Sequence, residues 1–224
     1  MLDYKKVFLS NADDFEIDKI YRELLLNKWQ FVILDIGGIL KVLTKEKSLF
    51  EIDDELEFLN LAKKDIYYKT IFTEFDNEVK GEDLEIFYNY LERYKQVLSK
   101  KVYGGKYFFG SIAVRTSKGF ITTIRGKENL DDYTWVLDVD HKEHLVKVFG
   151  SKATLNAPLL DYLFENNKKL KVIVHLNSEF DKGLMSLEYA FPGTIRDSIR
   201  DVQQSFNIKH HGVFYLFDDE GELI

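Results

Sequence analysis

The chain offers few residue types for catalysis or metal binding, because its 224 residues include five histidines and no cysteine. Thiolate zinc sites, iron–sulfur clusters, disulfides and thiol nucleophiles are therefore excluded. Any metal ion would need histidine, carboxylate or asparagine ligands. His175 lies in an apolar run, KVIVHLN, where a histidine is either a satisfied core residue or a ligand, and His211 precedes Gly212 near the C-terminus.

Acidic residues form two further candidate clusters. Asp138 and Asp140 end an apolar run and resemble the DxD of glycosyltransferases, in which two carboxylates bind a divalent ion, although an ordinary hairpin end explains them better. His141 and His144 follow as metal ligands or as a solvated loop. The acidic residues 218–222 resemble a calcium loop but are better interpreted as a β-turn.

Glycines suggest one phosphate-binding alternative. Gly37–Gly38 separates two β-rich runs, which is typical of a hairpin whose turn needs positive φ angles. A phosphate-binding loop is the functional alternative, but the spaced glycines of GxGxxG and the Lys-Ser/Thr of a P-loop are missing, which favours the hairpin. No Gly-x-Ser-x-Gly nucleophile motif is present either.

Composition predicts a globular protein, with 45% hydrophobic and 31% charged residues. The formal net charge of −7 argues against nucleic acid or an anionic membrane as a partner, while leaving room for a local basic site that binds a small anion. The N-terminus lacks the order of a signal peptide, and no apolar run approaches the length of a membrane helix. We therefore expect a cytoplasmic protein.

Periodicity predicts the elements that must position these residues. Helices are expected from about Asp14 to Lys28, over 53–75, 82–100, 156–166 and 194–206. Strands are expected at 4–9, on both sides of Gly37–Gly38, over the runs between 106 and 150, at 170–177, around 185–191 and in a last hairpin from 212. This pattern is typical of an α+β or three-layer protein with a mostly antiparallel sheet.

Several motifs occur in the same order as in one known family. They are Gly110-Ser-Ile-Ala-Val-Arg115, Thr123-Ile-Arg-Gly126, Val136-Leu-Asp-Val-Asp140, Thr154-Leu-Asn-Ala-Pro158, His175-Leu-Asn177, Phe191-Pro-Gly-Thr194 and His210-His-Gly-Val213. From about residue 85 to the C-terminus, the chain resembles the class II aldolase/adducin domain. Members of that family include metal-dependent sugar-phosphate aldolases.

The resemblance implies a metal site at His175, Asn177 and His211, with Asn156 at the position of the catalytic glutamate. In the active family, three histidines hold a zinc-like divalent ion and the glutamate handles the proton. Here an asparagine replaces the second histidine, and Asn156 cannot accept a proton. Metal affinity should fall, and an acid or base would have to come from elsewhere, for example Glu179 or Glu188.

The resemblance also implies a phosphate site at Ser111, Arg125, Gly126 and Thr154. Arg125 binds anions more strongly than the Ser or Thr that it replaces, because its guanidinium donates paired, charged hydrogen bonds. Lys127 lies close by in the sequence. The alternative interpretation is that Arg125 and Lys127 form a solvated turn pair.

Together these features predict an α/β protein with two parts. Residues 85–224 are expected to form a class II aldolase-like, three-layer α/β/α domain around a mostly antiparallel sheet, and residues 1–80 an N-terminal α+β extension. The expected function is that of a divergent sugar-phosphate lyase with a degenerate metal site, acting on a small phosphorylated sugar or another small anion. The alternative is a non-catalytic binding or scaffold protein. The family likeness also suggests a homo-oligomer.

Overall fold

The structure is a computed structural model that describes residues 3–45, 49–62, 68–74, 79–98, 101–102, 107–177, 181–187, 202–209 and 211–224. It divides into two compact units, residues 1–65 and 66–224. This boundary differs from the expected extension over 1–80. Residues 69–72 form β5 (Lys69–Phe72), which pairs with β11 (Leu145–Phe149) and so belongs to the second unit.

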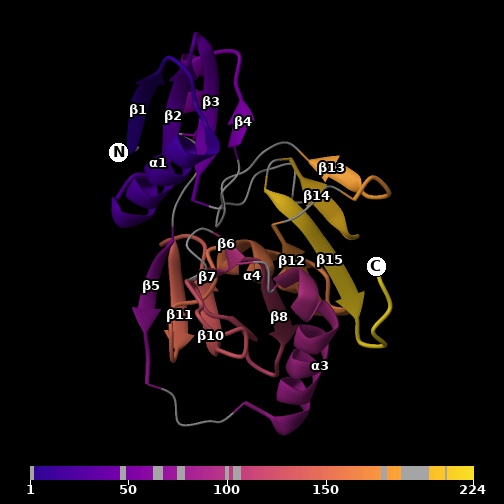
Figure 1. Cartoon of the computed structure of the whole chain (residues 1–224). Helices are drawn as coiled ribbons and strands as arrows, with labels where there is room; N and C mark the ends of the chain where they lie inside the picture. The colour runs from indigo at the N-terminus through magenta and orange to yellow at the C-terminus, as the bar shows by residue number, and fades with distance from the viewer. Residues whose placement is uncertain are drawn as a thin grey trace. The chain divides into compact units, whose positions relative to one another are not determined.

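The first unit is a four-stranded sheet in the order β1-β2-β3-β4 (Figure 1). Its elements are β1 (Tyr4–Leu9), α1 (Asp14–Leu26), β2 (Phe31–Ile36), β3 (Ile39–Thr44), β4 (Leu49–Glu51) and α2 (Glu55–Ala62). Asp13 caps α1 by accepting a hydrogen bond from the backbone N–H of Glu16. The Gly37–Gly38 hairpin is confirmed, and both glycines have the positive φ angles that its turn requires.

The second unit contains a sheet that has nine strands within the described ranges, in the order β13-β14-β15-β12-β8-β9-β10-β11-β5. Those not yet defined are β8 (Ser111–Arg115), β9 (Phe120–Thr123), β10 (Tyr133–Asp140), β12 (Leu170–Leu176), β13 (Met185–Leu187), β14 (Phe206–Ile208) and β15 (Gly212–Asp218). A separate ribbon pairs β6 (Lys101–Val102) with β7 (Tyr107–Phe108). Among the pairings described in the large sheet, β11–β5 and β13–β14 are parallel and the others antiparallel.

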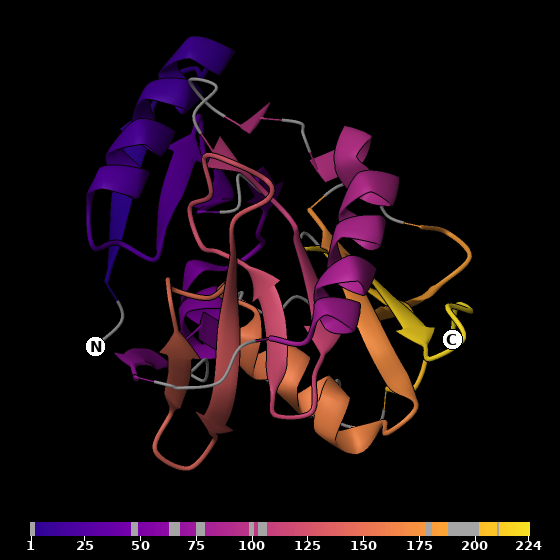
Figure 2. The ribbon, with the colours of Figure 1, turned by 90° about the horizontal axis from the view of Figure 1, so that it is seen from below.

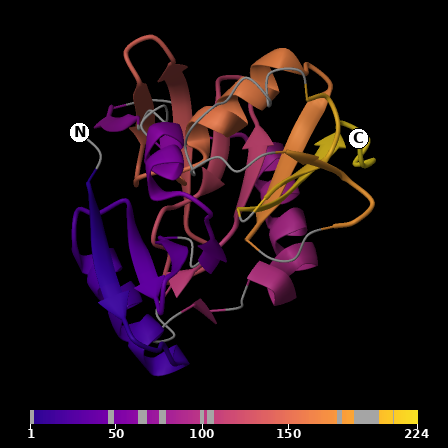
Figure 3. The same ribbon diagram turned by 90° about the horizontal axis from the view of Figure 1, so that it is seen from above.

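Two helices pack against opposite faces of this sheet, α3 (Gly81–Leu98) and α4 (Ala157–Asn166) (Figures 2 and 3). One core contains Phe87 and Leu91 of α3, and the other contains Leu160 and Phe164 of α4. The central strands are buried on both faces, which explains their nearly continuous apolar sequences.

Hydrogen bonds of charged side chains connect both helices to the sheet. The guanidinium of Arg115 donates to the carbonyls of Leu170, Phe164 and Asn167, and the last two lie at the C-terminal end of α4. Lys171 Nζ donates to the buried carboxylate of Asp83 in α3 at 2.8 Å. These bonds explain why two charged residues, Arg115 and Lys171, occur in otherwise apolar strands.

Two of the expected helices differ from the structure. Of the helix expected over 53–75, the structure describes α2 over Glu55–Ala62, whereas the β-prone residues Thr70, Ile71 and Phe72 pair with β11 instead. The helix expected over 194–206 lies mostly outside the described residues, and its last residue, Phe206, begins β14. The coarser prediction, a mixed α/β protein with a mostly antiparallel sheet, is confirmed. No helix in the described part of the chain is long and apolar enough to cross a membrane.

Candidate functional site

The structure brings together two histidines that are 36 positions apart in the sequence. His175 lies near the end of β12, and His211 lies in the connection between β14 and β15. Their ring centroids are 4.9 Å apart at an interplanar angle of 74°. The His175 ring also stacks on Phe214 at 4.2 Å, and Phe214 stacks in turn on Phe206. An aromatic column therefore fixes the plane of the His175 ring.

Gly212 allows β15 to approach β12 at this point. Its φ angle is +137°, and a Cβ atom added to it would lie 2.1 Å from the carbonyl oxygen of Leu176. No larger residue fits without moving the backbone. His211 is therefore followed directly by the glycine that makes the close contact between β15 and β12, and this contact positions the His211 side chain.

The hydrogen bond of His175 determines which of its ring nitrogens is available. Nδ1 lies 3.1 Å from the carbonyl oxygen of Val213, so Nδ1 carries the proton and donates. Nε2 is buried and has no hydrogen-bond partner among the described residues. Burial and the nearby charge of Lys127 lower the pKa of His175 to about 4, although the Val213 carbonyl and the Asn177 amide partly oppose this shift. The ring is therefore neutral at pH 7, with its lone pair on Nε2.

Ser111 begins β8 directly opposite His175, in the register Ser111↔His175. Its side chain is buried, and its hydroxyl has no hydrogen-bond partner in the described part of the chain. Buried polar atoms in folded proteins nearly always have partners. Two such atoms, Ser111 Oγ and His175 Nε2, thus come from residues paired across adjacent strands.

Lys127 supplies a positive charge beside these groups. Only 3% of the residue is exposed, and its Nζ donates to the carbonyl oxygen of Gly110 at 2.6 Å. Burial lowers its pKa to about 8, so the amine is still mostly protonated at pH 7. No carboxylate forms an ion pair with it within the described ranges. We call Ser111, Lys127 and His175 the buried cluster.

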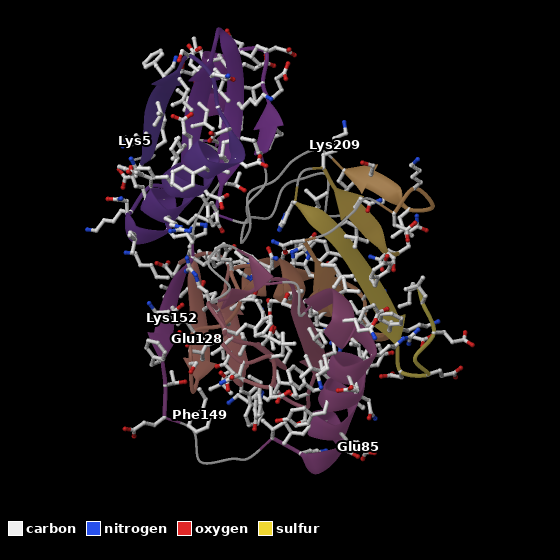
Figure 4. All side chains as sticks on the ribbon, viewed as in Figure 1. Lys5, Glu85, Glu128, Phe149, Lys152 and Lys209 are labelled. Carbon is white, nitrogen blue, oxygen red and sulfur yellow. The ribbon has the colours of Figure 1, made fainter. Side chains whose placement is uncertain are left out.

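The other residues expected to bind phosphate lie closer to the surface. Arg125 and Gly126 are exposed, and Thr154 is half-buried. The backbone places two of their segments side by side, because the Arg125 N–H donates to the carbonyl of Lys152 at 2.8 Å. Figure 4 labels Lys152 and Glu128, two exposed residues of these segments. The convergence of Ser111, Arg125, Gly126 and Thr154 on one anion stays a prediction.

One alternative from the sequence is wrong in part. Arg125 is exposed, as a solvated turn residue would be, but Lys127 is buried. Its stem turns inward because its ammonium group reaches the Gly110 carbonyl, while its own carbonyl accepts from the Phe108 N–H. Sequence reasoning gave Lys127 no separate role, since a lysine beside a glycine turn is ordinarily solvated.

The metal ligands of the family are only partly matched. His175 has the protonated Nδ1 and bare Nε2 of a typical ligand, but Asn177 offers an amide, and Asn156 is a buried residue at the start of α4. In the described part of the chain, no three His, Asp or Glu side chains are grouped so that they could hold a metal ion. The charge of Lys127 would also repel a divalent cation. This donor set does not fit the three-histidine centre.

A second histidine cluster, in the same unit, was not expected from the sequence. The Tyr68 hydroxyl lies 2.9 Å from His141 Nδ1, and His141 Nε2 lies 2.9 Å from Asp161 Oδ2. His141 lies in the turn between β10 and β11 and is partly exposed, as expected for a solvated loop, but both of its ring nitrogens have partners, which was not expected. We call Tyr68, His141 and Asp161 the triad. Burial raises the pKa values of Tyr68 and Asp161, while His141 partly opposes the shift at Asp161.

The acidic motifs have structural roles. Asp138 pairs with Lys147 on the surface, and Asp140 accepts from the N–H groups of Lys142 and Glu143, as expected for a hairpin end. Asp218 likewise accepts from two backbone N–H groups of the C-terminal turn. Other predicted features lie outside the described residues: Glu179, Glu188, the 191–194 motif and His210.

No protein-family model matches the chain, and no curated protein matches it. Among solved structures, YgbL from Klebsiella pneumoniae, "a putative aldolase/epimerase/decarboxylase", is 14% identical over 62% of this chain and 80% of its own, with a TM-score of 0.45. YgbL from Escherichia coli is 17% identical over 59% and 77%, with a TM-score of 0.43. L-fuculose-1-phosphate aldolase from Thermus thermophilus is 14% identical over 62% and 80%, with a TM-score of 0.42.

Proposed function

We propose that this chain binds a small anion at the buried cluster of Ser111, Lys127 and His175. The observation that carries the proposal is the buried ammonium group of Lys127, which has a backbone carbonyl as partner but no carboxylate in an ion pair among the described residues. A buried charge without a counter-charge is costly, and a bound anion would offset that cost.

The neighbouring groups suit an oxyanion. An ammonium group has three N–H donors, and among the described residues only the Gly110 carbonyl accepts one, which leaves two for a ligand. The Ser111 hydroxyl adds a third donor from the adjacent strand segment. Arg125 and Gly126 directly precede Lys127 in the chain and are exposed, so the chain reaches the surface next to the cluster.

A small phosphorylated sugar is the ligand that the resemblance to class II aldolases favours. The motifs at 110–115 and 123–126 border the buried cluster. Assignment of residues 85–224 to a three-layer, aldolase-like domain, and its assembly into a homo-oligomer, belong to the same proposal. Binding without aldolase chemistry is the version we favour, because Asn156 cannot act as a base and the described residues contain no group of three His, Asp or Glu side chains that could hold a metal ion.

A lyase is the second candidate, supported by the contact between His175 and His211. Metal analysis of protein purified without chelator separates the two. Stoichiometric zinc, manganese or iron that is lost in both His175→Ala and His211→Ala would favour the lyase. A metal-free protein whose phosphate affinity is retained in His211→Ala would favour binding alone.

Thermal unfolding with inorganic phosphate and with dihydroxyacetone phosphate tests the anion site. A ligand at about ten times its Kd stabilises the folded state by roughly 1.4 kcal/mol, which raises the Tm by a few degrees. We expect this rise in the wild type and in Lys152→Met, the control that removes an exposed lysine. Lys127→Met should remove it. No rise at 10 mM ligand, or an equal rise in Lys127→Met, would contradict the proposal.

A further inference from the structure

His175 Nε2 is a hydrogen-bond acceptor whose partner is missing from the described part of the chain. The Val213 carbonyl fixes the proton on Nδ1, and stacking on Phe214 prevents the ring from turning freely. Nε2 therefore presents a lone pair inside the protein, with 2% of the residue exposed. The Asn177 side chain lies close enough to the ring to raise its pKa, but it does not reach hydrogen-bond geometry at Nε2.

An unsatisfied buried acceptor is energetically unfavourable, and a ligand can remove the penalty only by donating a hydrogen bond. An ionised phosphate or carboxylate oxygen is itself an acceptor, so it would repel the lone pair. An ammonium donor would be repelled by the neighbouring charge of Lys127. A neutral hydrogen-bond donor is compatible with both the lone pair of His175 Nε2 and the positive charge of Lys127.

We infer that the ligand of this site carries a hydroxyl group, which donates to His175 Nε2 while the anionic group of the same ligand lies against Lys127 and Ser111. The inference rests on the proposed anion site and defines its substrate class as small hydroxylated anions, such as polyol phosphates or hydroxy acids. His175 then acts as a specificity residue for a hydroxyl group rather than as a metal ligand.

The test uses ligand pairs that differ by one hydroxyl group. Calorimetric titration compares 2-hydroxyethyl phosphate with ethyl phosphate, and 3-hydroxypropyl phosphate with propyl phosphate, so that two positions of the hydroxyl are sampled. A site that hydrogen-bonds a ligand hydroxyl discriminates strongly against the analogue that lacks it. We expect at least one hydroxylated member to bind about tenfold or more tightly than its partner.

His175→Asn provides the matched variant. The side-chain nitrogen of asparagine lies near the position of Nδ1, so this change keeps a donor for the Val213 carbonyl and removes Nε2. We expect the hydroxyl preference to fall to about one, while binding of ethyl and propyl phosphate persists. Because the ligand pairs are first compared on the wild type, the test does not depend on the variant being stable.

The outcomes separate the two claims. If none of the four phosphates binds, the proposed anion site itself is wrong. If all four bind and neither pair differs by more than twofold, the anion site stands and the hydroxyl inference is overturned. A preference for the hydroxylated ligand that persists in His175→Asn would also overturn the inference, because another residue would then bind the hydroxyl group.

Discussion

The second unit contains two histidine-centred clusters whose hydrogen bonds differ in completeness. In the triad, both ring nitrogens of His141 have partners, Tyr68 and Asp161, each at 2.9 Å. In the buried cluster, His175 Nε2 and Ser111 Oγ have none within the described residues, and Lys127 lacks a counter-charge there. The triad is complete within the described residues, whereas the buried cluster is the place where we propose that a ligand supplies the missing partners.

The largest expected effect comes from Gly212→Ala, which breaks the strand contact beside the buried cluster. The added Cβ would lie 2.1 Å from the Leu176 carbonyl, so β15 must move away from β12. We expect a loss of about 3 kcal/mol or more in the free energy of unfolding, measured by urea denaturation.

Gly126→Ala is the matched control, because Gly126 also has a positive φ angle but no atom lies within 4 Å of its added Cβ. Its cost should be about 1 kcal/mol, the steric cost of the left-handed conformation alone. Equal costs for the two variants would contradict the close contact at Gly212.

Lys127→Met should stabilise the ligand-free protein. The lowering of the lysine pKa from 10.5 to about 8 corresponds to a burial cost of about 3 kcal/mol at pH 7, and loss of the bond to Gly110 returns about 1 kcal/mol. We therefore expect a gain of about 2 kcal/mol by urea denaturation. A loss of stability would mean that Lys127 is a structural residue, like those of the triad.

The same lysine predicts a pH dependence. Its folded-state pKa lies below its ordinary value, so between pH 8 and pH 10.5 the unfolded chain binds more protons than the folded chain. The wild type should therefore gain stability relative to Lys127→Met as the pH rises through that range. Urea denaturation of both proteins at pH 7.5, 9 and 10 measures the difference. A constant difference would contradict the lowered pKa.

Asp161→Asn tests the triad. The variant keeps the shape of the side chain but removes the charge that accepts from His141. We expect a loss of about 1 to 2 kcal/mol in unfolding free energy, since hydrogen bonds to charged groups contribute somewhat more than neutral ones. The phosphate-induced rise in Tm should not change. Loss of that rise would mean that the two clusters are coupled.

Tyr68→Phe should have the smallest effect. It removes one hydroxyl, which is half of the pairing of His141, and leaves the ring contacts with His141 and His144 in place. A cost of about 1 kcal/mol or less is expected from a single neutral hydrogen bond, measured by urea denaturation. A cost above that of Asp161→Asn would reverse the order of importance within the triad.

Sequence reasoning found elements whose signals are local. The Gly37–Gly38 hairpin, α1, α4 and the central strands follow from turn residues and periodicity. It missed β5, because the pairing partner of that strand lies more than 70 residues away in β11. The contact of His175 with His211 joins residues 36 positions apart in the sequence. The inward turn of Lys127 and the bonds of His141 depend on tertiary contacts that no local pattern encodes.

Proton uptake on anion binding tests the central claim most directly. Near pH 8, Lys127 is about half protonated in the free protein, and a bound anion should complete its protonation. Sulfate is the probe, because it carries no titrating proton in this range. Calorimetry in two buffers of different ionisation enthalpy should give an uptake of about half a proton per sulfate at pH 8, almost none at pH 6, and no sulfate binding in Lys127→Met. Sulfate binding without proton uptake at pH 8, or with the same uptake in Lys127→Met, would contradict the assignment of Lys127 as the anion-binding charge.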